Sequence, residues 1–156
     1  MDTKAYLLCG LTGSGKTTLA KRLESRHSAV RFSVDEWMLK LYGEHMPRDV
    51  FDVRLAACKA LILELSEQLL SAGVSVIWDF GFWRRAEREQ MDAWLSVRGF
   101  EAERYFLDAP LDELWARLKR RNATLDNSTF EITREMLEMF AQNFEPPLER
   151  EGWQIP

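Results

Sequence analysis

The sequence predicts an α/β fold with three layers, in which a parallel sheet of about five strands lies between helices. Short apolar runs alternate with longer segments of helical periodicity, which is the order of elements in a parallel sheet. Several of the apolar runs end at an aspartate, and these residues are Asp35, Asp79 and Asp108. Because the carboxyl ends of parallel strands meet at one edge of the sheet, where ligands bind, the aspartates mark the expected site.

The composition is that of one globular domain. The chain has 156 residues, of which 46% are apolar, and this is enough to bury a single core. Its net charge of −4 argues against binding a long nucleic acid, since phosphate contacts need clustered cations. The sequence shows no signal peptide and no apolar stretch long enough to span a bilayer. We therefore expect a single cytoplasmic domain over residues 1–156, without membrane contact. Cys9 and Cys58 lack metal-ligand or redox spacing and are expected to be buried.

The first half of the chain predicts three strands and three helices. Tyr6–Cys9 is a short apolar run closed by Gly10, and it is the first expected strand. The other elements are a helix over 16–26, a strand over 30–34, a helix over 37–42, a long helix over about 50–71 and a strand over 74–78. The long helix has apolar residues four positions apart, which are expected to face the core: Ala57, Leu61, Leu65 and Leu69.

The second half continues the alternation. A helix over 84–97 is expected to turn Met91, Trp94 and Leu95 inward, and a fourth strand covers 104–107. Pro110 opens the next helix, whose apolar stripe consists of Leu111, Leu114, Trp115 and Leu118. A polar loop over 122–129 precedes a last helix over about 131–144, and residues 153–155 are a candidate closing strand.

One strong motif lies between the first strand and the first helix. Residues 10–17 fit the pattern G-x-x-x-x-G-K-[ST], in which glycines let the backbone wrap around phosphates with its N–H groups pointing inward. Lys16 is expected to reach the β- and γ-phosphates, and the Thr17 hydroxyl is a candidate Mg²⁺ ligand. The predicted nucleotide-binding residues of this segment are Gly10, Thr12, Gly13, Ser14, Gly15, Lys16, Thr17 and Thr18.

With this loop in place, the chain resembles the small P-loop kinases that phosphorylate hydroxyl groups. It is most similar to the group that includes zeta toxins, chloramphenicol phosphotransferase and polynucleotide kinase, and the resemblance covers nearly the whole chain. It implies the P-loop NTPase fold, with ATP as the nucleotide and Mg²⁺ as the metal. The residues alone leave ATP and GTP open.

The resemblance gives Asp35 a role. In these kinases the strand after the P-loop helix ends in an aspartate that accepts the proton of the attacking hydroxyl, and Phe32-Ser33-Val34-Asp35 is the matching stretch. Asp35 is therefore the candidate base, with a water-mediated contact to Mg²⁺ as a further option. The alternative is that Asp35 only caps the helix that follows it.

The stretch that ends at Asp79 has the form of a Walker B segment. Asp79 is expected either to hold water near Mg²⁺ or to bind a substrate hydroxyl, with a structural hydrogen bond as the plain alternative. The aromatic residues directly after it, Phe80, Phe82 and Trp83, are expected to border the substrate cleft or to belong to the core. We assign Asp79 and Trp83 to substrate binding.

The resemblance also implies a mobile lid, here short and near residues 119–130, with arginines on the preceding helix. We assign Arg117 to adenine stacking and Arg121 to the transferring phosphate, with Arg120 as an alternative to Arg121. The plain alternative is a solvated helix end. Arg54 on the long helix is the best placed cation for the acceptor, and the further candidates are Arg48, Arg84, Arg85 and Arg88. His27 and His45 are isolated and are expected on the surface.

Three functions follow from these features. The first is an ATP-dependent phosphotransferase that acts on a hydroxyl of a small molecule, with Lys16, Asp35 and Arg121 as its catalytic residues. The second is a kinase of nucleotides, nucleotide-sugars or nucleic-acid ends. The third is an ATP-binding switch or ATPase that transfers nothing to a small molecule. The charge pattern indicates no protein partner.

Overall fold

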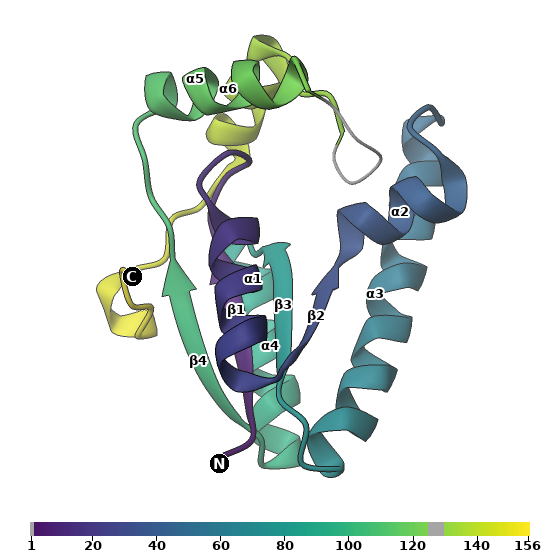
Figure 1. The fold of residues 1–156 in the computed structure, drawn as a ribbon, viewed down its shortest axis with the longest axis vertical. Helices are drawn as coiled ribbons and strands as arrows, with labels where there is room; N and C mark the ends of the chain where they lie inside the picture. The colour runs from purple at the N-terminus through teal and green to yellow at the C-terminus, as the bar shows by residue number, and fades with distance from the viewer. Residues whose placement is uncertain (1, 125–129) are drawn as a thin grey trace.

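The computed structural model describes residues 2–124 and 130–156 and has the predicted α/β architecture (Figure 1). Its sheet has four strands, β1 (Lys4–Cys9), β2 (Val30–Ser33), β3 (Val76–Gly81) and β4 (Glu101–Phe106). The strands are parallel and lie in the order β2-β3-β1-β4. Beyond β4, Gln154 forms a single parallel bridge with Tyr105, so the expected closing strand consists of one bridged residue.

Helices cover both faces of the sheet. They are α1 (Lys16–His27), α2 (Val34–Tyr42), α3 (Arg48–Ser71), α4 (Arg85–Arg98), α5 (Leu111–Asn122) and α6 (Arg134–Asn143), followed by a 3-10 turn over Glu149–Glu151. Helix α1 lies on one face, α3 and α4 lie on the other, and α5 and α6 lie beyond the carboxyl ends of β1 and β3 (Figure 1). In the parts of the chain that the structure describes, no helix has both the length and the apolarity needed to cross a bilayer.

Alternation along β1 builds both cores. Tyr6 and Leu8 face α1 and pack with Ala20 and Leu23, while Leu7 faces the opposite side with the residues of α3 and α4. A parallel sheet needs this double cover because its strands have no solvated face. Cys9 and Cys58 are free and buried, as predicted, and burial raises the pKa of the Cys9 thiol to about 12.

The predicted inward face of α3 is wrong by one position. The buried residues of α3 are Cys58, Ile62, Ser66 and Leu70, whereas Leu61 is 52% exposed and Leu65 is 41% exposed. A serine faces the core because its hydroxyl accepts a hydrogen bond from Trp78 Nε1, at 2.9 Å. The prediction assumed that only apolar residues face the core, and it failed because the polar residue Ser66 has a buried hydrogen-bond partner.

Several predicted element boundaries are also wrong, among them the end of β3 and the start of α2. Strand β3 runs on through Asp79 to Gly81, because the chain continues to pair with β1 past a register shift near Cys9. Helix α2 begins at Val34, three residues before the prediction, and Ser33 caps it by accepting a hydrogen bond from Glu36 N–H. The Ser-x-x-Glu spacing of residues 33–36 is a helix-start signal that accounts for this boundary.

Candidate functional site

The loop between β1 and α1 has the backbone geometry that a phosphate cradle requires. Gly13 and Gly15 have φ angles of 85° and 99°, a left-handed region that is open to glycine but strained for other residues. The Lys16 ammonium lies across the loop and donates a hydrogen bond to the Leu11 carbonyl at 2.9 Å. The N-terminus of α1 follows directly, so its free N–H groups point to the same space.

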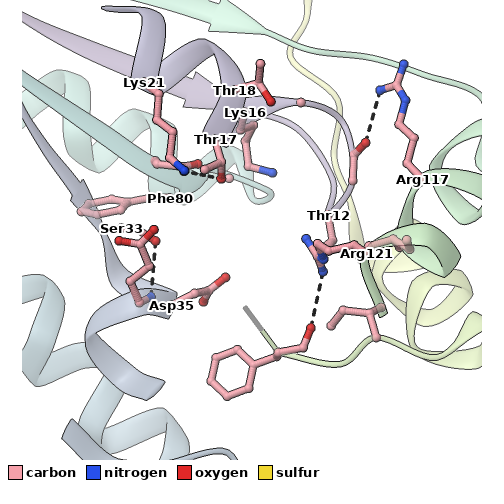
Figure 2. Close-up of a pocket in the computed structure, with 18 of the residues that line it drawn as sticks. Thr12, Lys16, Thr17, Thr18, Lys21, Ser33, Asp35, Phe80, Arg117 and Arg121 are labelled. Carbon is pink, nitrogen blue, oxygen red and sulfur yellow. Dashed lines mark hydrogen bonds between the residues drawn. The ribbon is translucent and has the colours of Figure 1, made fainter. Parts of the chain in front are cut away.

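This loop borders a cleft of about 520 Å³ at the carboxyl ends of the strands. The cleft is lined by the loop, by the first turn of α2, by the end of β3, by α5 and by two residues after residue 129, Phe130 and Ile132. Figure 2 shows Lys16, Asp35 and Arg121 on different sides of this space. The predicted site residues that line it are Thr12, Gly13, Gly15, Lys16, Thr17, Thr18, Asp35, Asp79, Trp83, Arg117 and Arg121.

Thr17 and Asp79 form a direct pair. The Thr17 hydroxyl donates a hydrogen bond to Asp79 Oδ2 at 2.9 Å, and Asp79 is 9% exposed. A hydroxyl and a carboxylate next to the phosphate loop are oxygen ligands of the kind that Mg²⁺ prefers, directly or through water. The donor set therefore fits the metal that the loop motif implies. Among residues 2–124 and 130–156, no cluster of three or more His, Cys, Asp or Glu side chains could hold a metal by itself.

Asp35 lies in the first turn of α2 and faces the cleft. Asp35 is exposed to the cleft, and partial desolvation by the surrounding protein atoms raises its pKa. Lys16 opposes that shift and Asp79 adds to it. Since Ser33 supplies the cap of α2, a capping role does not explain Asp35.

Lys16 is perturbed by the same surroundings. Desolvation lowers the pKa of its ammonium, and the carboxylates Asp79 and Asp35 oppose this shift. Its ammonium hydrogen-bonds the Leu11 carbonyl and is near two carboxylates, and phosphate oxygens would replace these contacts with stronger, charge-assisted ones.

The two predicted arginines of α5 reach the cleft from the side opposite Asp35 (Figure 2). Arg117 donates a hydrogen bond to the Gly13 carbonyl at 3.2 Å and pairs with Glu113 at 2.6 Å. Arg121 donates to the Phe130 carbonyl at 3.4 Å, and its Nε is buried without a partner in the described part of the chain. Burial lowers the pKa of Arg121, and Asp35 opposes this shift.

The aromatic run after Asp79 divides between the two expected environments. Phe82 is 2% exposed and belongs to the core, while Phe80 and Trp83 line the cleft. The Trp83 indole N–H donates a hydrogen bond to the Gly10 carbonyl at 2.9 Å, so this side chain contacts the phosphate loop as well as the cleft.

Three predicted site residues do not line the cleft, namely Gly10, Ser14 and Arg54. Ser14 is buried within the loop, and the Arg54 guanidinium lies over the Tyr42 ring, 4.2 Å from its centroid. Arg88 is 1% exposed and pairs with Glu151, so it is not available to bind the acceptor substrate. Residues 125–129 of the predicted lid lie outside the described residues.

Sequence reasoning missed several residues of the cleft wall. Ser33 lines it from the end of β2, Glu36 from α2 and Lys21 from α1, and the others are Gly81, Leu118, Thr124, Phe130 and Ile132. Glu36 is held by a bidentate pair with Arg31, with both N–O distances at 3.1 Å. The capping signal of residues 33–36 is the one sequence feature that places Ser33 and Glu36 beside Asp35.

Comparison with known families and structures agrees with this geometry. The sequence profile of a family described as an AAA domain matches residues 6–147. No curated protein matches this chain by sequence.

Several solved structures share the fold. A chain of the Pnkp1/Rnl/Hen1 RNA repair complex matches with a TM-score of 0.74 and 20% identity. The match covers 91% of the present chain but only 44% of the chain from the complex. Kti12 from Chaetomium thermophilum, in complex with ADP-AlF3, matches with a TM-score of 0.71 and 17% identity, over 97% of this chain and 86% of Kti12. A gluconokinase from Sinorhizobium meliloti 1021 has a TM-score of 0.64 and 14% identity, over 97% of this chain and 81% of the enzyme. At these identities the likeness shows the fold alone.

Proposed function

We propose, from the premise that this chain belongs to the AAA domain family and has a kinase-like P-loop domain, that it transfers the γ-phosphate of ATP to a hydroxyl group of a small molecule. One observation carries the proposal: a single cleft holds Lys16 of the phosphate loop, the Thr17–Asp79 pair and a separate carboxylate, Asp35. Phosphoryl transfer requires mainly that the reacting groups are correctly positioned and that the negative charge on the phosphate oxygens is neutralised, and these residues can do both.

Asp35 is the proposed base. The acceptor oxygen forms a bond to the γ-phosphorus while the bond to the bridging oxygen of ADP breaks, and the hydroxyl proton passes to the Asp35 carboxylate. A raised pKa suits this role, because a stronger carboxylate base takes up the proton more readily as the new bond forms.

The remaining groups hold the phosphates. Lys16 and the N–H groups of the loop bind the β- and γ-phosphate oxygens, and Thr17 with Asp79 would hold Mg²⁺. When bound, Mg²⁺ neutralises charge on these oxygens. Arg121 lines the cleft on the side opposite Asp35, where its guanidinium suits contact with the transferring phosphoryl group, and Arg117 lies beside Gly13 for the base of the nucleotide.

The acceptor end of the cleft indicates the kind of alcohol that it takes. We define this end by Ser33, Asp35, Glu36, Phe80, Trp83 and Phe130, which combine carboxylates with aromatic rings. Two cations behind this wall are themselves paired with carboxylates: Arg31 binds Glu36 at 3.1 Å, and Lys59, which lies 5.8 Å from the Phe80 ring centroid, pairs with Glu87. Such a wall favours an uncharged or cationic alcohol with an apolar part over a phosphorylated one.

A panel of matched alcohols tests this function. Purified protein with Mg²⁺ and ATP is incubated with acceptors that differ only in a neutral, amino or phosphate substituent, and phosphorylated products are identified by mass spectrometry. We expect product with neutral or amino compounds and none with the phosphate-bearing partner. Preference for the phosphorylated member would contradict the acceptor class, and absence of product with every member would count against the kinase.

A second candidate function is the phosphorylation of nucleotides or nucleic-acid ends. One observation favours it: a hollow on the outer face of α1 is lined by Thr18, Lys21, Arg22, Ser25 and Arg26, and it shares Thr18 and Lys21 with the cleft. Phosphate contacts of this kind weaken steeply with salt. A short oligonucleotide with a 5′-hydroxyl should then become phosphorylated at low salt, and Arg22→Ala together with Arg26→Ala should abolish this reaction.

A further inference from the structure

The chain leaves β3 through a strained turn beside the phosphate loop. Gly81 has a φ angle of +87° and Phe82 has a φ angle of +50°, although a phenylalanine is disfavoured in this left-handed region. Residues in such a conformation persist only where their surroundings hold them in place. The turn places the Trp83 indole next to the carbonyl of Gly10, the first glycine of the phosphate loop.

The first glycine of the phosphate loop is held at both of its backbone polar groups by this turn. Gly10 N–H donates to the Gly81 carbonyl at 3.0 Å, and the Gly10 carbonyl accepts from Trp83 Nε1 at 2.9 Å. Packing here leaves no spare room, since a Cβ added to Gly81 would lie 2.9 Å from Trp83 Nε1. The Trp83 ring also packs on Phe140 of α6, with ring centroids 4.8 Å apart.

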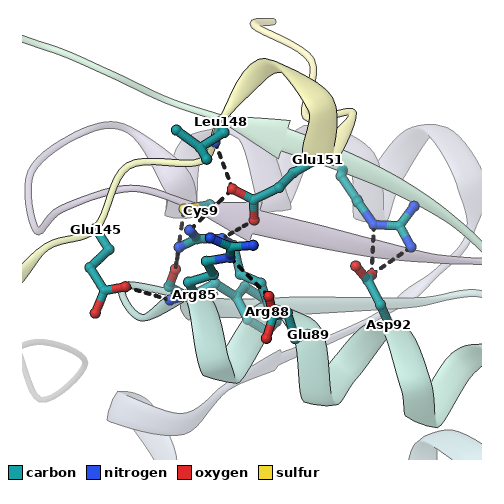
Figure 3. A network of polar contacts seen from close by, with 10 residues as sticks. Cys9, Arg85, Arg88, Glu89, Asp92, Glu145, Leu148 and Glu151 are labelled. Atoms are coloured by element: carbon teal, nitrogen blue, oxygen red, sulfur yellow. Dashed lines mark hydrogen bonds and ion pairs between the residues drawn. The ribbon is translucent and has the colours of Figure 1, made fainter.

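A buried ion pair fixes the turn from behind (Figure 3). Arg88 is 1% exposed, donates from Nη1 to the Phe82 carbonyl at 2.9 Å, and pairs through Nε with Glu151 at 2.8 Å. Glu151 accepts a further hydrogen bond from Leu148 N–H at 2.6 Å. From the same C-terminal segment, Glu145 N–H donates to the Trp83 carbonyl at 2.8 Å.

We propose that Trp83 is a positioning residue for the phosphate loop and that the buried Arg88–Glu151 pair holds Trp83 in position. Glu145 contacts the Trp83 carbonyl directly, and Glu151 acts on the turn through Arg88, which donates to the Phe82 carbonyl. Trp83 in turn reaches the Gly10 carbonyl, where the loop begins. The loop therefore has its phosphate-binding shape before a nucleotide arrives, which removes an ordering cost from binding. This inference depends on the proposed function only in that the loop binds the phosphates of a nucleotide.

Trp83→Phe is the direct test, because it keeps an aromatic ring and removes the indole N–H. The matched control is Trp94→Phe, since Trp94 packs in the core against Trp78 and Phe100. Loss of one hydrogen bond predicts about 3- to 10-fold weaker binding of Mg²⁺–ATP in calorimetry, at an almost unchanged melting temperature. Hydrogen exchange of residues 10–15 in the nucleotide-free protein should also become faster. Trp94→Phe should change neither the affinity for Mg²⁺–ATP nor the exchange of residues 10–15.

The double variant Arg88→Met with Glu151→Leu tests the anchor without leaving one buried charge unpaired. We expect a folded protein in which residues 10–15 and 81–84 exchange faster and Mg²⁺–ATP binds several-fold more weakly. Unchanged exchange of residues 10–15 in both Trp83→Phe and the double variant would overturn the inference. The exchange measurement needs no nucleotide, so it tests this inference even if the wild-type protein does not bind ATP. A wild-type protein that does not bind ATP would instead contradict the proposed function.

Discussion

Asp35 is the residue on which the proposed chemistry depends most. It faces the cleft from the first turn of α2, and desolvation raises its pKa above the ordinary value of 3.8 although Lys16 and Arg121 oppose the shift. A carboxylate in this situation destabilises the folded protein at neutral pH, because its charged form is better solvated in the unfolded chain. Active sites commonly carry such groups, which favours a functional role over a structural one.

Asp35→Asn should therefore slow phosphate transfer by about 100-fold or more while leaving the affinity for Mg²⁺–ATP within a few-fold. It should also raise the melting temperature at neutral pH, though only slightly, because water in the cleft screens the charge of this exposed carboxylate. Because the folded-state pKa is raised, the stabilising effect of protonated Asp35 is fully present below pH 3.8 and is lost as the pH rises through the folded-state value. The advantage of the variant should accordingly vanish in acid.

Thermal unfolding at several pH values, together with transfer assays, measures both effects. The matched control is Asp49→Asn, an exposed carboxylate in the first turn of α3, which should leave transfer unchanged. A variant of Asp35 with wild-type transfer would remove Asp35 as the base.

The Thr17–Asp79 pair gives a second prediction at this scale. Asp79→Asn should raise the Mg²⁺ concentration for half-maximal activity by about 10-fold, since a neutral amide is a poorer partner for the hydrated cation. A Mg²⁺ titration at saturating ATP measures this shift. If the variant instead raised KM for the acceptor at an unaltered Mg²⁺ requirement, Asp79 would belong to substrate binding.

Single residues were predictable from the sequence where the chemistry is local. The spacing of Gly10, Gly15 and Lys16 identifies the phosphate loop because backbone geometry and charge both depend on neighbouring positions. Arg88 was misassigned as a surface candidate, since its partner Glu151 is 63 positions away and no local pattern shows the pair. Long-range pairing of this kind is set by packing, which periodicity does not describe.

At the scale of elements, helix α3 shows where pattern reasoning fails. Its sequence carries two rows of residues four positions apart, one through Leu61 and Leu65 and one through Ile62 and Ser66. The more apolar row was predicted to be buried, yet the structure buries the second because Trp78 of β3 supplies a partner for Ser66. In α5 no such competing row exists, and Leu114 and Leu118 are buried as predicted.

The loop after α5 gives a prediction at the same scale. Asn122 closes it by donating from Nδ2 to the Ile132 carbonyl at 2.7 Å and accepting from Ile132 N–H at 3.3 Å. Asn122→Leu should therefore lower the free energy of unfolding by about 1–3 kcal/mol and raise KM for ATP several-fold, because Arg121 and Phe130 would no longer keep their places. Urea unfolding and steady-state kinetics measure these changes.

Asn143→Ala is the matched control for that experiment. Asn143 is exposed on α6, donates to the Met139 carbonyl and accepts from Arg84 at 3.3 Å, and none of these residues lines the cleft, so its loss should leave KM for ATP unchanged. Equal kinetic effects of the two variants would show that the Asn122 contacts have no special bearing on the cleft.

At the scale of the whole molecule, the predicted fold class is confirmed. Of the three aspartates expected to mark the site, Asp35 in α2 and Asp79 in β3 line one cleft, whereas Asp108 does not. The strand count of about five corresponds to four strands and the bridge at Gln154. The single domain over 1–156 and its lid stay predictions. The C-terminal segment was the least predictable part, because its contacts to Trp83 and Arg88 join distant parts of the sequence.

The fate of the γ-phosphate tests the central claim most directly. ATP labelled at that phosphate is given to the wild type, to Lys16→Ala and to Asp35→Asn, with and without an acceptor found in the alcohol panel. We predict that the label enters the organic product only when the acceptor is present, that Lys16→Ala abolishes turnover, and that Asp35→Asn slows transfer about 100-fold or more. Release of the label only as inorganic phosphate, at a rate independent of every acceptor, would contradict the kinase and favour an ATPase switch.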